Sequence, residues 1–230
     1  MNIYTVDYVA GAQSAQGVAI VIDVFRAFSV ACYAFANGAE RIIPVGDVGD
    51  ALRLRDAIPA AVLVGERGGK KLDGFDHGNS PTEIQAADVA GKTLIHTTHA
   101  GTQGLVNASN ATHVLTGAFV NASATIRYVQ SITPRTVTLV RMGLQAECNS
   151  DEDDLCAEYL RCLLTGDAFD VAAIKPTLRA SQFSDRFFDP QKPWAPQSDF
   201  DFCLDVDRFD FALRAQRSHD GELSLTQIPI

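Results

Sequence analysis

The stretch from Gly17 to Ala36, GVAIVIDVFRAFSVACYAFA, decides the fold of this chain. Its first part, Gly17–Asp23, is a short apolar run with the length and composition of a buried strand. Its second part, Phe28–Ala36, carries apolar residues at helical spacing, and Gly38 stands where it would end a helix. A buried strand followed directly by a helix indicates the first unit of a mainly parallel sheet covered by helices.

The same alternation continues along the chain. The further strands that we expect are Arg41–Val45, Ala61–Gly65, Lys92–His96, Thr112–Thr116 and Thr136–Arg141. The helices that we expect between them are Asp47–Ala57 with Asp47 as its N-cap, a short helix from Pro81, Gly101–Ala108, Val120–Gln130 and Asp151–Leu163. The pattern predicts an α/β fold.

The signal changes beyond Asp167. Residues Phe187–Phe211 mix aromatic residues, Asp and prolines, which predicts an irregular segment packed on the rest of the chain. Asp220-Gly221 divides two short runs and predicts a short β hairpin at the C-terminal end. We therefore expect one domain over residues 1–230, with a core at 1–165 and a C-terminal extension at 166–230.

Composition narrows the function. The length of 230 residues fits one domain, and 47% hydrophobic residues suit a folded globular chain. The formal net charge of −9 argues against a nucleic-acid partner, and no apolar run is long enough for a membrane span. Five cysteines without a CxxC pair suit reduced thiols, so we expect a cytoplasmic protein. Aromatic stretches such as Phe187-Phe188 and Phe209–Phe211 could cover a homo-oligomer partner as easily as the chain's own core.

Polar residues follow the expected strands. In an open parallel sheet the ligand site lies beyond the carboxyl ends of the strands. The residues found there are Asp23, Arg26, Ser29, Glu66, Arg67, Gly68, Gly69, Thr97, Thr98, His99, Thr102, Gly117, Asn121 and Arg141. Loops of this kind are polar in any case, and Asp23 could serve only as a helix cap. Arg26 is nevertheless a good bidentate partner for a phosphoryl or sulfonyl group.

The segment Gly65–Pro81, GERGGKKLDGFDHGNSP, interleaves glycines with charges of both signs. Glycines let backbone N–H groups approach an anion, and the charged side chains supply cationic contacts and oxygen ligands. A solvated flexible loop is the alternative, although a plain connector has little need for this composition. The segment is not a P-loop, because the GxxxxGK[ST] spacing fails. It predicts a site for a small anion.

Two further features bear on the site. His77 and His99 lie in polar loops, where each could contact substrate or be an ordinary surface residue. The run Asp151–Asp154 begins an expected helix, where one or two carboxylates complement the helix dipole. The surplus suits Mg²⁺, which proteins bind through one or two carboxylates plus phosphate.

With these motifs the chain resembles the 2-phosphosulfolactate phosphatases, the ComB-like enzymes of coenzyme M biosynthesis. The matching residues are Asp23-Val24-Phe25-Arg26-Ala27, Gly65-Glu66-Arg67-Gly68-Gly69, Gly74-Phe75-Asp76, Gly78-Asn79-Ser80-Pro81, Thr97-Thr98, Gly117, Asn121-Ala122-Ser123 and Glu152-Asp153. The chain departs from the family in the turn Thr97–Thr102, which is one residue longer than TTNGT, and at Phe28, which replaces a small hydroxyl residue. Both departures bear on substrate identity.

The resemblance implies a Mg²⁺-dependent phosphatase that acts on a small anionic phosphorylated hydroxy acid. The catalytic residues that it implies are Asp23, Arg26, Glu66 and Arg67, with the two arginines on the phosphoryl oxygens. The Mg²⁺ ligands would come from Asp23, Glu66, Asp76, Glu152 and Asp153. The substrate-binding residues would be Ser29, Gly68, Gly69, Asn79, Ser80, Thr97, Thr98, Thr102 and Asn121.

Two other functions stay open. One is a phosphatase of the same fold that acts on a different small phosphoester, and the other is a non-catalytic protein that binds a phosphorylated ligand. The attacking group, water or a carboxylate, is also open. Charge neutralisation of the phosphoryl group is needed in either chemistry.

Overall fold

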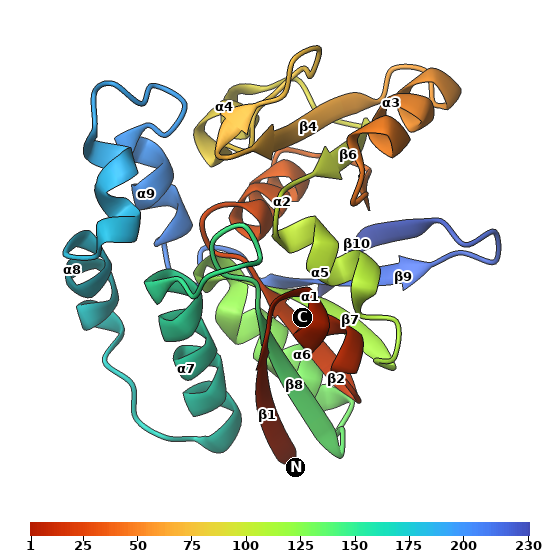
Figure 1. Ribbon diagram of the computed structural model, residues 1–230. Coiled ribbons are helices and arrows are strands. Elements are labelled where there is room, and N and C mark those ends of the chain that lie inside the picture. Colours follow the sequence, from red (N-terminus) through yellow and green to blue (C-terminus); the bar gives the residue numbers. More distant parts are fainter.

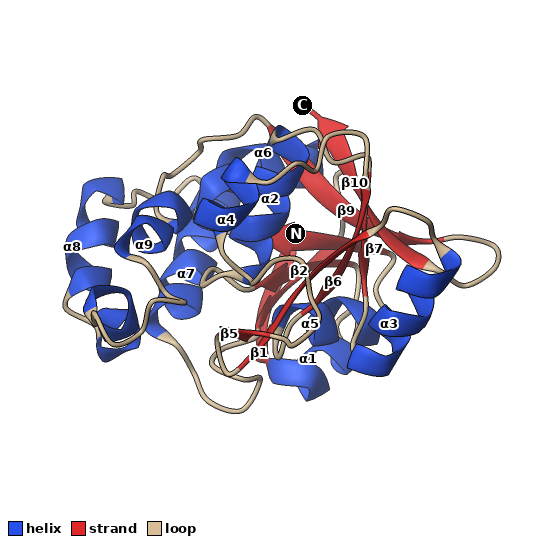
Figure 2. Ribbon diagram, turned by 90° about the horizontal axis from the view of Figure 1, so that it is seen from above, coloured by secondary structure: helices blue, strands red, loops and turns tan.

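The apolar run at the start of residues Gly17–Ala36 forms strand β2, Val18–Ile22, in which all five residues are buried. The computed structural model covers residues 1–230 and places helices on both sides of the strands (Figures 1 and 2). A strand that is covered on both faces needs apolar residues at consecutive positions, which the sequence VAIVI supplies. The predicted α/β architecture, with a mainly parallel sheet, is confirmed.

The strands are β1 (Asn2–Asp7), β2 (Val18–Ile22), β3 (Arg41–Pro44), β4 (Val62–Arg67), β5 (Lys70–Lys71), β6 (Thr93–Thr97), β7 (His113–Gly117), β8 (Thr136–Arg141), β9 (Phe211–Arg217) and β10 (Leu223–Pro229). The helices are α1 (Tyr8–Ser14), α2 (Ala27–Ala36), α3 (Val48–Ala57), α4 (Pro81–Ala86), α5 (Gly101–Asn107), α6 (Ala122–Ser131), α7 (Asp151–Thr165), α8 (Ile174–Arg179) and α9 (Gln197–Cys203). Short 3-10 turns are η1 (Phe119–Asn121), η2 (Val171–Ala173) and η3 (Gln182–Phe188).

The ten strands lie in the order β1-β8-β2-β7-β9-β10-β3-β6-β4-β5. Strands β1, β8, β2 and β7 form one parallel block, and β3, β6 and β4 form another. The C-terminal hairpin β9–β10 pairs with β7 on one side and with β3 on the other, so the predicted hairpin is confirmed and lies inside the sheet. The last strands of the chain therefore join the two blocks.

The two blocks run in opposite directions, because every pairing from β7 through β9 and β10 to β3 is antiparallel. Their carboxyl ends nevertheless meet: a Cβ added at Gly101, after β6, would lie 2.7 Å from Oδ2 of Asp23, which follows β2. The sheet thus brings distant loops to one place.

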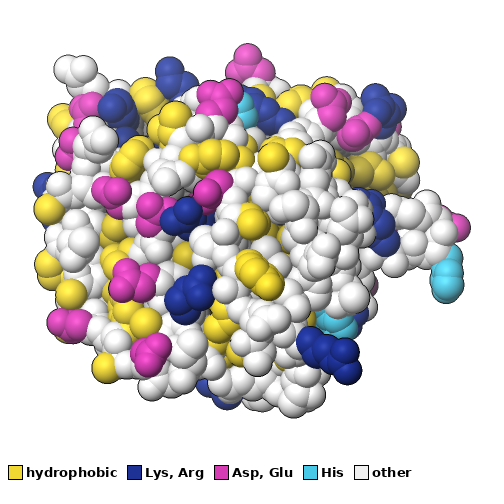
Figure 3. Space-filling view, turned by 60° about the horizontal axis from the view of Figure 1, so that its bottom comes forward, with side chains coloured by type: hydrophobic (Ala, Val, Ile, Leu, Met, Phe, Trp, Pro, Cys, Tyr) yellow, Lys and Arg dark blue, Asp and Glu magenta, His cyan; other side chains and the backbone are white.

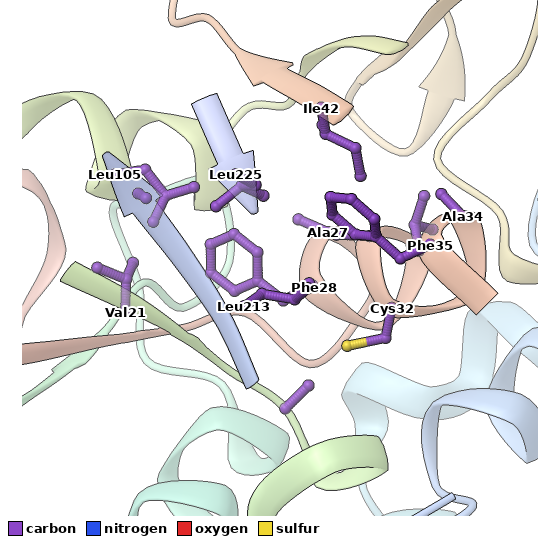
Figure 4. Packing of buried hydrophobic residues seen from close by; sticks show 14 of the residues in the cluster. Val21, Ala27, Phe28, Cys32, Ala34, Phe35, Ile42, Leu105, Leu213 and Leu225 are labelled. Atoms are coloured by element: carbon purple, nitrogen blue, oxygen red, sulfur yellow. The ribbon is translucent and has the colours of Figure 1, made fainter. Parts of the chain in front are cut away.

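Alternate residues of β2 face different cores. Ala19 and Val21 belong to a buried cluster that also contains residues of α1, α2 and α5, whereas Val18, Ile20 and Ile22 belong to a cluster with α6 and α7. Phe28 of α2 is almost fully buried in the first cluster, beside Leu213 and Leu225 of the hairpin (Figure 4). The sequence departure at Phe28 therefore lies in the core.

The N-terminal elements β1 and α1 were not predicted. Strand β1 pairs only with β8, at the edge of the sheet, and Tyr4 in it is 55% exposed. An edge strand is covered less than a central one, so its sequence NIYTVD lacks the continuous apolar run that marked β2. Strand β1 is only partly buried, so its sequence does not show the apolar pattern from which the other strands were predicted.

Leu225→Ala is expected to lower the free energy of unfolding by about 2–3 kcal/mol, because it removes buried methyl groups and leaves a cavity. Leu225 is 1% exposed and pairs with Ile42 where the hairpin meets β3. Urea unfolding followed by circular dichroism measures the loss. Gln227→Ala on the same strand is the control, since Gln227 is exposed; equal losses in both variants would contradict a packed junction.

No helix of this structure combines the length and the apolar composition needed to cross a membrane. On the face shown in Figure 3, acidic and basic side chains are interspersed, without a continuous patch of either sign. A nucleic-acid surface would require clustered Lys and Arg. The view therefore gives no support to a polyanionic partner on this face.

Candidate active site

A pocket of about 90 Å³ lies where the loops after β2, β4, β6 and β8 converge. Helix α7 and the turn η3 complete it. Its lining residues are Asp23, Phe25, Arg26, Glu66, Gly68, Gly69, Asn79, His99, Ala100, Gly143, Leu144, Gln145, Glu152 and Arg186. The sequence-predicted residues Asp23, Arg26, Glu66, Gly68, Gly69, Asn79 and Glu152 are thus brought together.

Asp23 lies at the end of β2 and is buried. Its Oδ1 accepts a hydrogen bond of 3.1 Å from the backbone N–H of Ala27, at the start of α2. A side chain at Gly101 would collide with Oδ2, so glycine is required there. Asp23 therefore does cap a helix, as the simple alternative held, and it also lines the pocket.

Glu66 fixes one wall of the pocket through both of its carboxylate oxygens. Oε2 accepts from Gly69 N–H at 2.6 Å, and Oε1 accepts from His99 N–H at 2.8 Å. Gly68 and Gly69 have φ values of 60° and 82°, the left-handed conformations of a two-residue hairpin turn. This turn joins β4 to β5, so the start of the Gly-rich segment is a hairpin held by Glu66.

Helix α7 places two acidic residues close to the pocket with different surroundings. Both oxygens of Asp153 accept backbone hydrogen bonds, from Val24 at 2.9 Å and from Gly143 at 2.8 Å. Asp153 therefore ties the loop after β2 to the loop after β8. Glu152 lines the pocket, and its Oε2 is buried without a hydrogen-bond partner.

The two arginines predicted to contact phosphate are engaged with the protein. Arg26 donates from Nη1 to the Trp194 carbonyl at 2.8 Å and to the Asp199 carboxylate, and from Nη2 to the Gly69 carbonyl at 3.0 Å. Arg67 is not among the pocket residues, because neighbouring side chains of β4 point to opposite faces. Its Nη2 donates instead to Thr97 Oγ1 at 3.0 Å.

The predicted hydroxyl residues lie behind the pocket wall. Thr97, Thr98 and Thr102 are fully or almost fully buried, and the hydroxyls of the latter two cap the backbone of their own turn. Ser29 donates to the Val24 carbonyl at 2.9 Å. Ser80 is the N-cap of α4 and accepts from Glu83 N–H at 3.2 Å. These contacts shape the loops, and none of these residues lines the pocket.

Three other sequence candidates lie elsewhere. Asp76 pairs with Arg55 and accepts from Leu63 N–H at 2.8 Å, away from the pocket residues. Asn121 is buried and donates to the Phe211 carbonyl at 3.1 Å. His77 is outside the pocket, whereas His99 lines it with a buried, unpartnered Nδ1. The structure therefore does not bring Asp76 together with Asp23.

Burial raises the pKa of three carboxyl groups at the site, those of Asp23, Glu152 and Asp153. Burial raises the pKa of Asp23 to about 6, opposed by the Ala27 N–H and assisted by the charge of Glu66. Burial raises the pKa of Glu152 to about 7, and the charge of Arg186 opposes this increase. Burial also raises the pKa of Asp153 well above its ordinary value. A cation beside these groups would stabilise their ionised forms.

Sequence reasoning missed Arg186 and Asp199. Asp199 is fully buried on α9 between apolar neighbours, Phe200 and Cys203, of the same helix. Arg186 lies in η3 next to Phe187, whose ring centroid is 4.9 Å from its guanidinium carbon. In both places the sequence signal was a charged residue next to aromatic residues, which indicates a charge that could be buried. The irregular pattern of that region hid which face each residue would take.

Comparison with known proteins shows which family this chain is similar to. The model of the 2-phosphosulpholactate phosphatase family matches residues 3–217. A probable 2-phosphosulfolactate phosphatase of Bacillus subtilis is 33% identical over 206 residues, which is 89% of this chain and 88% of that protein. A protein with the same description from Caldanaerobacter subterraneus is 34% identical over 83% of this chain and 84% of its own length. One from Caldicellulosiruptor saccharolyticus is 40% identical over 61% of this chain and 60% of its own length.

Proposed function

The chain belongs to the 2-phosphosulpholactate phosphatase family, and we propose that it hydrolyses 2-phosphosulfolactate with the help of Mg²⁺. In this reaction the oxygen of a water molecule bonds to phosphorus, the ester P–O bond breaks, and the leaving oxygen takes a proton. The products are sulfolactate and inorganic phosphate. The observation that carries the proposal is the pocket that Asp23, Glu152 and Arg186 line together.

The charge of the pocket supports a cation as part of the enzyme. Asp23, Glu66 and Glu152 line it together with only two arginines, and Arg26 is already paired with Asp199. A substrate that carries phosphate and further acid groups would be repelled by this surplus of negative charge. A divalent cation would remove the repulsion.

Asp23 and Glu152 are the residues that would hold Mg²⁺. Glu152 Oε2 has no hydrogen-bond partner, whereas both oxygens of Glu66 and of Asp153 accept from backbone N–H groups. No three acidic, histidine or cysteine side chains are grouped as a metal site in this structure, but Mg²⁺ commonly uses one or two carboxylates with water and phosphate. When bound, the ion would neutralise phosphoryl charge and orient the attacking oxygen.

Other residues in and around the pocket would hold Asp23 and Glu152 in position. Glu66 fixes the Gly68-Gly69 turn against the loop after β6, and Asp153 fixes the loops after β2 and β8. Phosphoryl transfer depends mainly on positioning and charge neutralisation, so rigid walls around the phosphoryl group serve it directly. The buried threonines of the Thr97–Thr102 turn support the same wall.

Phosphate release from 2-phosphosulfolactate is the test. Purified enzyme is assayed with Mg²⁺, with EDTA, and with a panel of phosphorylated hydroxy acids and sugars. We expect release that EDTA abolishes and Mg²⁺ restores, with the highest kcat/KM on 2-phosphosulfolactate. A higher kcat/KM on another ester would show that the protein is a phosphatase with a different substrate. Tight binding of an ester without release of phosphate would show that the protein is a non-catalytic binding protein.

The metal-free protein is expected to lose stability as the pH rises from 5 to 8. The pKa values of Asp23 and Glu152 rise from 3.8 and 4.5 to about 6 and about 7, so the folded state binds more protons than the unfolded chain between these values. The free energy of unfolding then falls with pH across that range, and we expect a Tm decrease of about 5 °C. Thermal unfolding in EDTA measures it.

Two comparisons isolate the origin of that pH dependence. The double variant Asp23→Asn, Glu152→Gln should show a clearly smaller decrease, because neither amide titrates. Mg²⁺ should raise the Tm of the wild type more at pH 8 than at pH 5, since ionised carboxylates bind it. A double variant with the wild-type pH slope would contradict this assignment.

We also propose that the enzyme acts in the cytoplasm. All five cysteines are unpaired, and Cys32, Cys156 and Cys203 are buried. Free thiols are typical of proteins that work in a reducing compartment.

A further inference from the structure

Arg186 differs from the other arginines of the site in its free donors. Its only hydrogen bond runs from Nη2 to the Phe25 carbonyl at 3.1 Å, and its Nε is buried without a partner. Arg26 in the same pocket has both Nη1 and Nη2 engaged with the protein, and Arg67 lies outside the pocket. Arg186 is therefore the pocket guanidinium with donors left for a ligand.

The guanidinium of Arg186 is held in place by its surroundings. Its carbon lies 4.9 Å from the centroid of the Phe187 ring and 6.0 Å from that of the Phe25 ring. Together with the bond to the Phe25 carbonyl, these contacts fix the plane of the group before any ligand arrives. A fixed planar guanidinium suits two parallel hydrogen bonds to an oxyanion.

Glu152 and Arg186 line the same pocket without pairing with each other. Both residues line the pocket, and each has a buried polar atom without a hydrogen-bond partner, Oε2 and Nε. The two side chains do not form a salt bridge within 4.0 Å. Because these two opposite charges are not paired, the pocket leaves room for an anionic group beside Arg186 and for a cation beside Glu152.

From this gap we propose that Arg186 is a catalytic residue that binds the oxygens of the transferring phosphoryl group, between itself and a cation at Glu152 and Asp23. The proposal rests on the proposed function and extends it to a residue from the C-terminal part of the chain. In this arrangement Arg186 would neutralise negative charge on the phosphoryl oxygens, and a cation held by Glu152 and Asp23 would supply further positive charge.

Binding of inorganic phosphate in the presence of Mg²⁺ tests the proposal directly, by isothermal titration calorimetry on the full-length protein. Arg186→Gln is expected to weaken the Kd for phosphate by about 10- to 100-fold, because a charge-assisted pair of hydrogen bonds is lost. The kcat should fall by a similar or larger factor. Arg186→Lys keeps the charge without the planar geometry, and it should recover part of the phosphate affinity.

Arg179→Gln is the matched control, since Arg179 also stacks on an aromatic ring, that of Phe188 at 3.5 Å, but is exposed and outside the pocket. It should bind phosphate as the wild type does. Unchanged phosphate affinity in Arg186→Gln, with the fold intact by circular dichroism, would overturn the proposal and leave the phosphatase standing. If the wild type releases no phosphate from any ester, the proposed function fails, while the binding comparison still reports on Arg186.

Discussion

Asp23→Asn is expected to lower kcat by about 10³-fold without unfolding the protein. Asp23 is the pocket carboxylate that follows the central strand β2, and with Glu152 it would hold the Mg²⁺. Loss of a charged metal ligand removes several kcal/mol of charge stabilisation at the phosphoryl group, which corresponds to this factor. Steady-state phosphate release at saturating Mg²⁺ measures the effect.

Stability should move in the opposite direction to activity in this variant. Asparagine retains the Oδ1 that accepts from Ala27 N–H, so the cap of α2 is kept. It also removes a buried carboxyl whose pKa burial raises to about 6, so at pH 8 the metal-free variant should be at least as stable as the wild type. The Tm increase produced by Mg²⁺ should shrink. Loss of activity with a lowered Tm in EDTA would indicate a structural defect instead.

Asp76→Asn is the control for this prediction, because the sequence resemblance implied both aspartates as Mg²⁺ ligands. Asp76 is paired with Arg55 outside the pocket. Hydrogen bonds from Arg55 and from the Leu63 N–H lower its pKa despite partial burial, which would raise it. The variant should retain most of the wild-type kcat. An equal loss in Asp76→Asn and Asp23→Asn would contradict the site as drawn from the pocket residues.

Most strands and helices from β2 to α7 could be predicted because burial there has a clear sequence signature. The run VAIVI of β2 is apolar at every position, and Asp47 accepts from Asp50 N–H as the N-cap of α3. The strand Thr136–Arg141 has the predicted bounds. Strand β1 could not be predicted in this way, because an edge strand lacks the continuous apolar run of a buried strand. The position of the hairpin β9–β10 in the sheet could not be predicted either, because pairing between strands that are far apart in the sequence leaves no local sequence pattern.

The site could be predicted in part for a similar reason. Glu66 lies at the end of β4 and His99 follows β6, and these are neighbouring parallel strands, so the order of strands and loops was enough to place these two residues together. Asp23 follows β2 in the other parallel block, and its place beside them depends on the antiparallel hairpin between the blocks. The different directions of Glu66 and Arg67 depend on β4 continuing through both residues. A Gly-Gly pair after a strand is the signal for a hairpin turn, and applying it would have extended β4 and separated the two side chains.

Asp199→Asn is expected to lower the free energy of unfolding by about 3–5 kcal/mol, because it leaves the buried guanidinium of Arg26 without its counterion. Asp199 is fully buried and pairs with Arg26, which is 4% exposed. Its Oδ1 also accepts from Ser80 Oγ at 2.8 Å and from Thr82 N–H at 3.0 Å. One carboxylate thus joins α9 to the start of α4 and to the loop after β2.

The loss should be visible in urea unfolding followed by circular dichroism, and it is a large part of the roughly 5–15 kcal/mol that is typical of native proteins. Asp201→Asn, two residues further along α9, is the matched control. Asp201 forms an exposed pair with Lys175, with Asp201 and Lys175 side chains 44% and 56% exposed. Such pairs contribute about 0–1 kcal/mol. Equal losses of unfolding free energy in the two variants would show that the buried Arg26–Asp199 pair contributes no more to stability than the exposed pair.

A second substitution separates the charge from the packing. Arg26→Met in the Asp199→Asn background should recover part of the lost stability, because the uncompensated charge disappears while an apolar side chain fills its place. It should not recover activity, since Arg26 also donates to the Gly69 carbonyl and so holds the turn that forms one wall of the pocket. Recovered stability with persistently low activity would therefore show that the uncompensated charge of Arg26 causes the loss of stability, and that the contact of Arg26 with Gly69 serves the pocket separately.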